Sequence, residues 1–226
     1  MGDAIVQALP SAVVVAISPV PIVAVVLMLL SARGRVNGPA FVLGWMIGLA
    51  TVGAVCLSVA SGGDSGTPAE RDRWISVVLV VSGVLLLLVA LKQWRGRSRA
   101  GGHVIAPRWL DAFDTFSPVK AAGAGVVFSM NPKNLLLAFA GAAEIVQTGI
   151  SADRQVVAYV VFVVIATMGI GTPLLIHLAM GDRSRQLLEH LKSWMIRNSA
   201  VIMAVLSFII GVKLIADGIS RLARVI

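Results

Sequence analysis

Long apolar stretches separated by short polar breaks dominate this chain of 226 residues. Six stretches reach the roughly 20 residues that an α-helix needs to cross a bilayer. We place them at roughly 4–31, 39–61, 74–94, 121–148, 154–180 and 198–220. The pattern therefore predicts an all-α integral membrane protein with six transmembrane helices.

The first apolar stretch differs from a cleaved signal peptide. It has no basic start, it runs well beyond about 15 apolar residues, and it contains Pro19 and Pro21 in its middle. A cleaved signal peptide has a basic start and a short apolar region. We expect this stretch to remain in the mature protein as the first membrane helix.

Composition supports the membrane interpretation and excludes most soluble classes. The chain is 58% hydrophobic and 13% charged, with a mean hydropathy of +0.91, whereas soluble domains are about 45–50% apolar and about 25% charged. We expect residues 1–226 to form a single membrane domain. Cys56 is the one cysteine, and the three histidines show no ligand spacing, so we expect no metal and no cofactor.

The net charge of +8 is unevenly distributed along the chain. Most basic residues lie in alternate loops, at Arg33, Arg35, Lys92, Arg95, Arg97, Arg99, Arg108, Lys120, Arg183, Arg185, Lys192 and Arg197. The positive-inside rule makes these loops cytoplasmic, which places both termini outside a cytoplasmic (inner) membrane. The basic residues thus indicate contact with membrane lipids, and not with nucleic acid.

The longest polar break divides the chain into two halves. Residues 95–120 are basic and glycine-rich, and we interpret them as a cytoplasmic linker between residues 1–94 and residues 121–226. Each half has three predicted spans. Because three is an odd number, the second half enters the membrane in the opposite sense, which predicts an inverted repeat.

Each half opens with a span that proline interrupts, and the two interruptions occupy matching positions. Proline removes a backbone donor and frees a carbonyl, so the polar backbone at that depth must face protein or a water-filled cavity. Paired breaks of this kind mark the central site of many transporters, although ordinary kinks are an alternative. The candidate substrate-binding residues are Pro19, Pro21, Asn131, Pro132, Lys133 and Asn134.

Lys133 lies about a dozen residues into the apolar run that starts at Ala121. A charged side chain at such a depth costs at least about 2.5 kcal/mol. One interpretation is that Lys133 contacts an anionic substrate group or pairs with a carboxylate. The other is that the span begins near Ser129 and that Lys133 extends to the cytoplasmic interface.

Four further titratable residues are candidates for coupling or gating: Glu144, His177, Lys213 and Asp217. Lys213 and Asp217 are one helical turn apart and are expected to pair with each other. Glu144 lies three turns beyond Lys133, too far to pair with it, and is expected to mark the outer interface. His177 either relays protons or lies at the cytoplasmic interface.

Several motifs together resemble one family of membrane proteins. They are residues 107–114 (Pro-Arg-Trp-Leu-Asp-Ala-Phe-Asp), 117–121 (Ser-Pro-Val-Lys-Ala), 131–135 (Asn-Pro-Lys-Asn-Leu), 18–21 (Ser-Pro-Val-Pro) and 44–45 (Gly-Trp). The chain resembles the peptidoglycolipid-addressing (GAP, Sap-like) family of actinobacterial proteins, within the lysine-exporter (LysE) superfamily. The resemblance covers nearly the whole chain, and Asn-Pro-Lys is its most specific part.

The resemblance implies both an architecture and a function. Members of the superfamily are similar in having two inverted three-helix repeats and are mostly exporters, while the GAP branch is associated with glycolipid delivery. The expected function is therefore export of a glycolipid or lipid-like substrate by alternating access, by the chain alone, as a homo-oligomer or within a lipid-export complex. Export of amino acids or other small polar solutes, and a nonenzymatic accessory role in lipid export, are the alternatives.

An enzymatic role is the least favoured class. The sequence has no P-loop, no HExxH motif and no serine-histidine-acid grouping on matching membrane faces. We therefore expect a transporter that is not an enzyme and that draws energy from an ion gradient or a partner.

Overall fold

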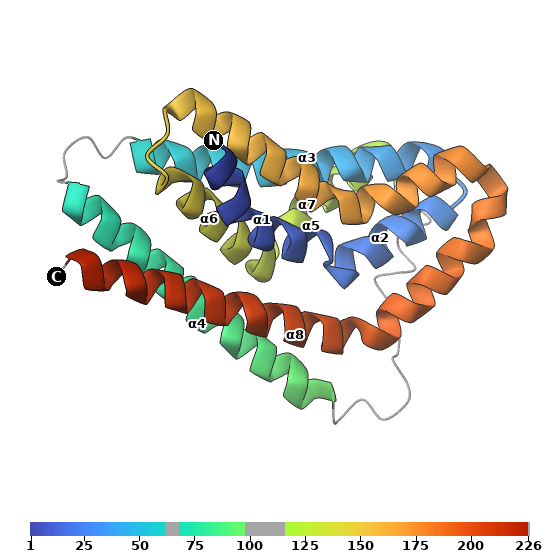
Figure 1. Ribbon diagram of the computed structural model, residues 1–226. Helices are drawn as coiled ribbons and strands as arrows, with labels where there is room; N and C mark the ends of the chain where they lie inside the picture. Colours follow the sequence, from blue (N-terminus) through green and yellow to red (C-terminus); the bar gives the residue numbers. More distant parts are fainter. Residues whose placement is uncertain (62–67, 98–115, 226) are drawn as a thin grey trace.

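The computed structural model describes residues 1–61, 68–97 and 116–225, and within these ranges the protein consists of helices joined by short turns (Figure 1). Most of the predicted linker at 95–120 lies outside the described residues. The helices are α1 (Gly2–Ala16), α2 (Pro19–Leu30), α3 (Gly34–Ser61), α4 (Pro68–Arg97), α5 (Pro118–Ser129), α6 (Pro132–Val146), α7 (Ala152–Met180), the 3-10 helix η2 (Gly181–Ser184) and α8 (Arg185–Val225).

Three helical stretches of the described chain are long and apolar enough to cross a membrane. They are Gly34–Ser58, Ile75–Arg95 and the 69 residues Ala152–Ser220. The pair α1 and α2 makes a fourth span if its two helices, bent by 52° at the break, count as one. The chain is therefore a membrane protein whose described residues are helical and contain three to four candidate spans, and the count of six stays a prediction.

Both predicted proline breaks are present. α1 ends at Ala16, and Ser18 adopts an extended conformation before Pro19 starts α2. α5 ends at Ser129, and Pro132 starts α6. Proline suits the first turn of a helix and forces the preceding residue out of the helical region, so each break follows directly from the local sequence.

The last helix begins earlier than the sequence indicated. The predicted span was 198–220, with the basic residues from Arg185 to Arg197 in a preceding loop, but α8 begins at Arg185 and contains 41 residues. Leu188 is fully buried, and Arg185 pairs with Glu189 one turn later. This amphipathic segment can be helical outside the apolar region, which a search for apolar runs does not detect.

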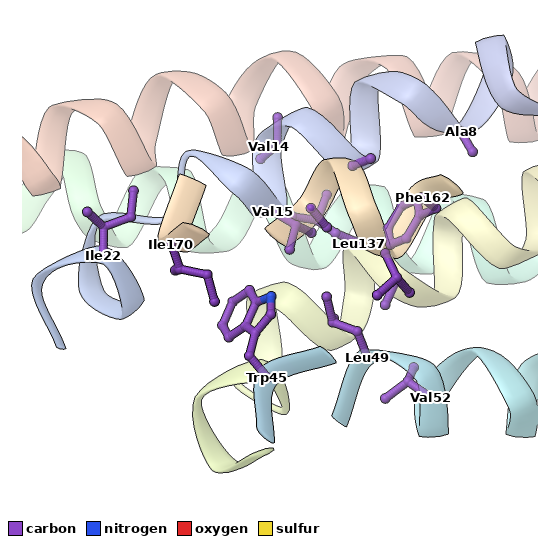
Figure 2. Packing of buried hydrophobic residues seen from close by; sticks show 14 of the residues in the cluster. Ala8, Val14, Val15, Ile22, Trp45, Leu49, Val52, Leu137, Phe162 and Ile170 are labelled. Atoms are coloured by element: carbon purple, nitrogen blue, oxygen red, sulfur yellow. The ribbon is translucent and has the colours of Figure 1, made fainter. Parts of the chain in front are cut away.

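The apolar core lies where α1, α3, α6 and α7 meet. Figure 2 shows Trp45 and Leu49 of α3 close to Val15 of α1, Leu137 of α6 and Ile170 of α7, and all five side chains are buried. The end of α1 is thus enclosed by helices from both halves of the chain. Side chains of these surrounding helices can therefore reach the break between α1 and α2.

Helix contacts follow a reciprocal pattern between the two halves. α1 packs on α7 as α5 packs on α3, α2 packs on α8 as α6 packs on α4, and α4 and α8 pack on each other. Gly83 and Gly211 meet where α4 and α8 cross. A Cβ on Gly83 would lie 2.7 Å from Gly211 O, and one on Gly211 would lie 2.9 Å from Gly83 O. Only glycine allows the two backbones to come this close.

Candidate functional site

Lys133, in the first turn of α6, connects the two helix breaks. Its side chain is only 3% exposed. Its Nζ donates hydrogen bonds to Ser18 Oγ at 2.6 Å and to Val14 O at 3.4 Å, and lies 3.6 Å from Met203 Sδ of α8. The two proline breaks, which are far apart in the sequence, are therefore in direct contact through this lysine.

The first break explains why Lys133 is held there. In an uninterrupted helix the Ser18 N–H would bond to Val14 O, but here it bonds to Val15 O at 3.2 Å. The freed Val14 carbonyl accepts from Lys133 instead. The C-terminal end of α1 also carries a partial negative charge, which stabilises the ammonium group.

The partners of the Lys133 ammonium group are all uncharged. They are a hydroxyl, a backbone carbonyl and a thioether. No carboxylate whose side chain the structure describes forms an ion pair with Lys133. A buried cation without an anionic partner is costly, so this position favours a negatively charged ligand.

Asn134 completes the link between the breaks. Its Oδ1 accepts from Ser18 Oγ at 3.0 Å, and its Nδ2 donates to Phe128 O, near the end of α5, at 3.2 Å. The first turn of α6 thus holds the ends of both interrupted helices. We call Ser18, Lys133 and Asn134 the Lys133 cluster.

Ser207 adds a further polar group beside this cluster. It lies one helical turn after Met203, on the same face of α8. Its hydroxyl is fully buried and has no hydrogen-bond partner in the described structure. An unpaired buried hydroxyl is unfavourable, and a ligand or a water molecule at this position would satisfy it.

The other predicted site residues have backbone roles in this structure. Pro19 and Pro21 are buried in the first turn of α2 and shape the break. Asn131 and Pro132 are exposed, and Asn131 Oδ1 caps α6 by accepting from the Lys133 N–H at 3.1 Å. These four residues hold the Lys133 cluster in place but do not belong to it.

A second polar cluster lies farther along the same helices. Glu144 of α6 is 1% exposed and forms an ion pair with Lys213 of α8. Ser11 Oγ donates to Glu144 Oε2 at 3.4 Å, and Lys213 Nζ also lies 3.1 Å from Asp217 Oδ2. We call Glu144, Lys213 and Asp217 the Glu144 cluster.

The Glu144 cluster confirms one expected ion pair and adds a second that the sequence did not indicate. The expected pair between Lys213 and Asp217 is present. The Glu144 side chain is enclosed by protein, and α8 brings Lys213 beside it, while its expected level at the outer interface stays a prediction. The sequence could not show this contact, since the two residues lie on different helices.

The two clusters lie at different levels of the same helices. Eleven residues of α6 separate Lys133 from Glu144, a distance of about 16 Å along a helix. α1 passes both clusters in the opposite direction, with Ser18 in one and Ser11 beside the other. α1, α6 and α8 thus make polar contacts with one another at two levels.

His177 is not part of either cluster. It lies near the end of α7, with Nδ1 at 3.2 Å from Ser184 Oγ of η2. The Ser184 hydroxyl donates to Gly181 O at 2.6 Å. The structure thus places His177 beside a turn, partly buried, and apart from the two helix breaks.

Comparison with known proteins identifies the family of this chain. A family model described as "Sap, sulfolipid-1-addressing protein" matches residues 8–220, a range that contains both clusters. The chain belongs to the sulfolipid-1-addressing protein family. The Sap-like resemblance is therefore confirmed, whereas membership of the lysine-exporter superfamily stays a prediction. Comparisons with curated proteins and with solved structures found no match.

The sulfolipid-1-addressing family assignment fits the physical character of the chain. Its apolar helices make it a membrane protein, and the family description connects it with lipids. That description refers to addressing a lipid and names no enzymatic reaction.

Several residues in or close to the two clusters were not identified as site residues from the sequence. Ser11, Ser18, Met203 and Ser207 carry no charge, and serine and methionine are common in apolar helices. Only Ser18 had a usable signal, because it directly precedes Pro19. The others are recruited by contacts between helices distant in the sequence.

Proposed function

We propose that this member of the sulfolipid-1-addressing family exports a lipid or lipid-like amphiphile across the cytoplasmic membrane by alternating access. The observation that carries the proposal is the hydrogen bond between Lys133 and Ser18, which joins the break of one half to that of the other. Interrupted helices that meet in this way form the central site in many transporters.

The proposed architecture is six crossings arranged as two inverted repeats. α1 with α2, and α5 with α6, each count as one interrupted crossing. The 69-residue stretch reverses direction after α7, so that α7 and α8 count as two crossings (Figure 1). The reciprocal contacts between halves, including that of Gly83 with Gly211, support a two-fold relationship. The charge distribution supports termini outside the membrane.

The Lys133 cluster is the proposed site for the polar part of the substrate. The buried ammonium group has no described acidic partner, and Ser207 leaves a hydroxyl unpaired nearby. An anionic substrate group would satisfy both. The interaction would be strong because it occurs away from bulk water.

An apolar cavity between α4 and α8 supports a lipid over a small polar solute. Its volume is about 400 Å³, within the roughly 300–1,000 Å³ of typical ligand pockets. Its lining includes Leu87, Leu91 and Trp94 of α4 with Ala204 and Phe208 of α8. Ala204 of the cavity directly follows Met203, the contact of Lys133, and we propose that an acyl chain in the cavity belongs to a lipid whose headgroup is held at the Lys133 cluster.

The Glu144 cluster is the proposed gate. Separating α6 from α8 at this level requires breaking the ion pair between Glu144 and Lys213. Asp217 offers Lys213 a second, more exposed partner, so the lysine can move outward without losing all its pairing. Energy for the movement would come from an ion gradient or a partner, and we propose no enzymatic step.

Reconstituted vesicles test the proposal directly. Purified protein is incorporated into vesicles with a fluorescent anionic lipid, and movement between leaflets is followed by a membrane-impermeant quencher. We expect wild-type protein to accelerate movement and Lys133→Gln to abolish it, while Lys120→Gln, which alters an exposed lysine, keeps wild-type activity.

Other outcomes identify the alternatives. Uptake or efflux of amino acids without lipid movement would favour a small-solute exporter. Movement of neither substrate by the pure protein, with activity restored by a cell extract, would favour an accessory subunit. Equal lipid movement by wild type and Lys133→Gln would disprove the assignment of the Lys133 cluster.

A further inference from the structure

A second cavity lies where the two halves meet at one end of the molecule. It has a volume of about 440 Å³. Its lining comes from the turn between α2 and α3 and from the segment that runs from α7 through η2 into α8. Figure 1 shows these two segments at the same end of the molecule. This cavity lies outside both polar clusters, and its lining is chemically different from that of the cavity between α4 and α8.

Two arginines from different halves line this cavity: Arg35 of α3 and Arg185 of α8. No hydrogen bond or ion pair links the Arg35 guanidinium to any group that the structure describes. Its Nη2 extends over the turn at Gly181, 3.8 Å from the position that a Cβ there would take. A guanidinium that faces a cavity without a partner can bind an oxyanion with two parallel hydrogen bonds.

Arg185 is also available to a ligand. Its contact with Glu189, at 3.4 Å, joins two exposed side chains one turn apart, and such pairs contribute little. Asp182 lines the cavity as well, but one carboxylate faces two guanidinium groups. The lining therefore keeps an excess of positive charge.

His177 and Ser184 supply further polar atoms. Because the Ser184 hydroxyl donates to Gly181 O, it accepts from the Nδ1–H of His177, which leaves Nε2 as the remaining polar atom of the ring. Leu29 and Leu30 line the same cavity. Polar and apolar lining side by side match a headgroup attached to a hydrocarbon chain better than a free ion.

We infer that this cavity binds the tetrahedral oxyanion, such as a phosphate group, of a lipid headgroup, held between Arg35 and Arg185. A ligand in this position bridges the first half of the chain to the second. The site is separate from the Lys133 cluster, so its test is made in a Lys133→Gln background, which removes the first proposed anion site from the measurement.

Native mass spectrometry of the full chain in detergent tests the inference, with dioleoylphosphatidic acid as the probe and dioleoylphosphatidylcholine as the neutral comparison. The variant is Arg35→Gln/Arg185→Gln. Its matched control is Arg33→Gln/Arg183→Gln, which removes two exposed positive charges from the same turns without altering the cavity lining. Thermal unfolding checks that both variants remain folded.

In the Lys133→Gln background, we expect phosphatidic acid binding to fall at least about tenfold when Arg35→Gln/Arg185→Gln is added and to stay within about twofold of Lys133→Gln alone when the control changes are added. An equal loss of phosphatidic acid binding in both variants would show that only the general surface charge matters and would overturn the inference. No loss of binding in either variant would overturn it as well. Inorganic phosphate is the second probe. If the complex with phosphatidic acid survives excess phosphate, the site binds lipid headgroups. If phosphate displaces the lipid, the same oxyanion site binds free phosphate.

Discussion

Lys133 of α6 donates a 2.6 Å hydrogen bond to Ser18, the residue between the end of α1 and the start of α2. Ser18 in turn donates to Asn134, the neighbour of Lys133. The first turn of α6 therefore recognises the first helix break through two consecutive side chains. If one half moves relative to the other, these hydrogen bonds either break or force α6 and the first break to move together.

Replacing Lys133 by methionine should separate function from stability. Methionine keeps most of the buried hydrocarbon and removes a charge whose burial is costly, so we expect the melting temperature in detergent to stay equal or rise. Binding of an anionic lipid at the Lys133 cluster should be lost. Thermal unfolding and lipid co-purification measure the two effects. A large fall in melting temperature would instead make Lys133 a structural cap of α1.

The two acids of the Glu144 cluster should differ in their contribution to stability. Glu144→Gln leaves a partly buried Lys213 without its enclosed partner, and we expect a loss of about 1–3 kcal/mol. Asp217→Asn alters a carboxylate whose side chain is 39% exposed, so we expect about 0–1 kcal/mol. Unfolding measurements give both values. Adding Lys213→Met to Glu144→Gln should recover much of the loss, and additive losses would contradict the pairing.

The crossing of α4 and α8 should not tolerate a methyl group. Gly83→Ala would place Cβ 2.7 Å from the backbone oxygen of Gly211, and we expect a loss of about 1–3 kcal/mol. Gly171→Ala is the matched control. Nothing lies within 4 Å of its added Cβ, so the helix should gain up to about 1 kcal/mol. Similar effects of both changes on unfolding would argue against close contact of α4 and α8.

Cysteine labelling should reveal the orientation in the membrane. In a Cys56→Ser background, Ala32→Cys and Gln186→Cys should react with an impermeant maleimide only from the cytoplasmic side, and Ser151→Cys only from outside. All three positions are exposed. The expectation follows from the basic turns at the first two positions. Labelling of Ala32→Cys and Gln186→Cys from opposite sides would disprove the proposed six-crossing topology.

Local features of the fold were accessible from the sequence. The breaks at Pro19 and Pro132 follow from the lost donor and fixed backbone angle of proline. The pair of Lys213 with Asp217 follows from helical spacing and is confirmed. α8 begins 13 residues before the predicted span 198–220, because its first segment is amphipathic and has no continuous apolar run.

Contacts between distant helices were not accessible in the same way. The sequence left open whether Lys133 is buried or reaches the interface, and only the packing of α1 and α8 around α6 shows that it is buried. The partnership of Glu144 with Lys213 depends on the same packing. The cavity between Arg35 and Arg185 joins two turns from different halves, and neither turn alone indicates a site.

α2 and α6 both begin with proline, but the next residue is Val20 in α2 and Lys133 in α6. In the proposed transport cycle, each half adopts in turn the conformation of the other half. The two resulting states are then not equivalent, because one encloses the Lys133 cation and the other encloses the aliphatic side chain of Val20. The inward-open and outward-open states would then differ in free energy without substrate, and one would be more populated. A bound anion would shift this balance, so that loading itself favours the return movement.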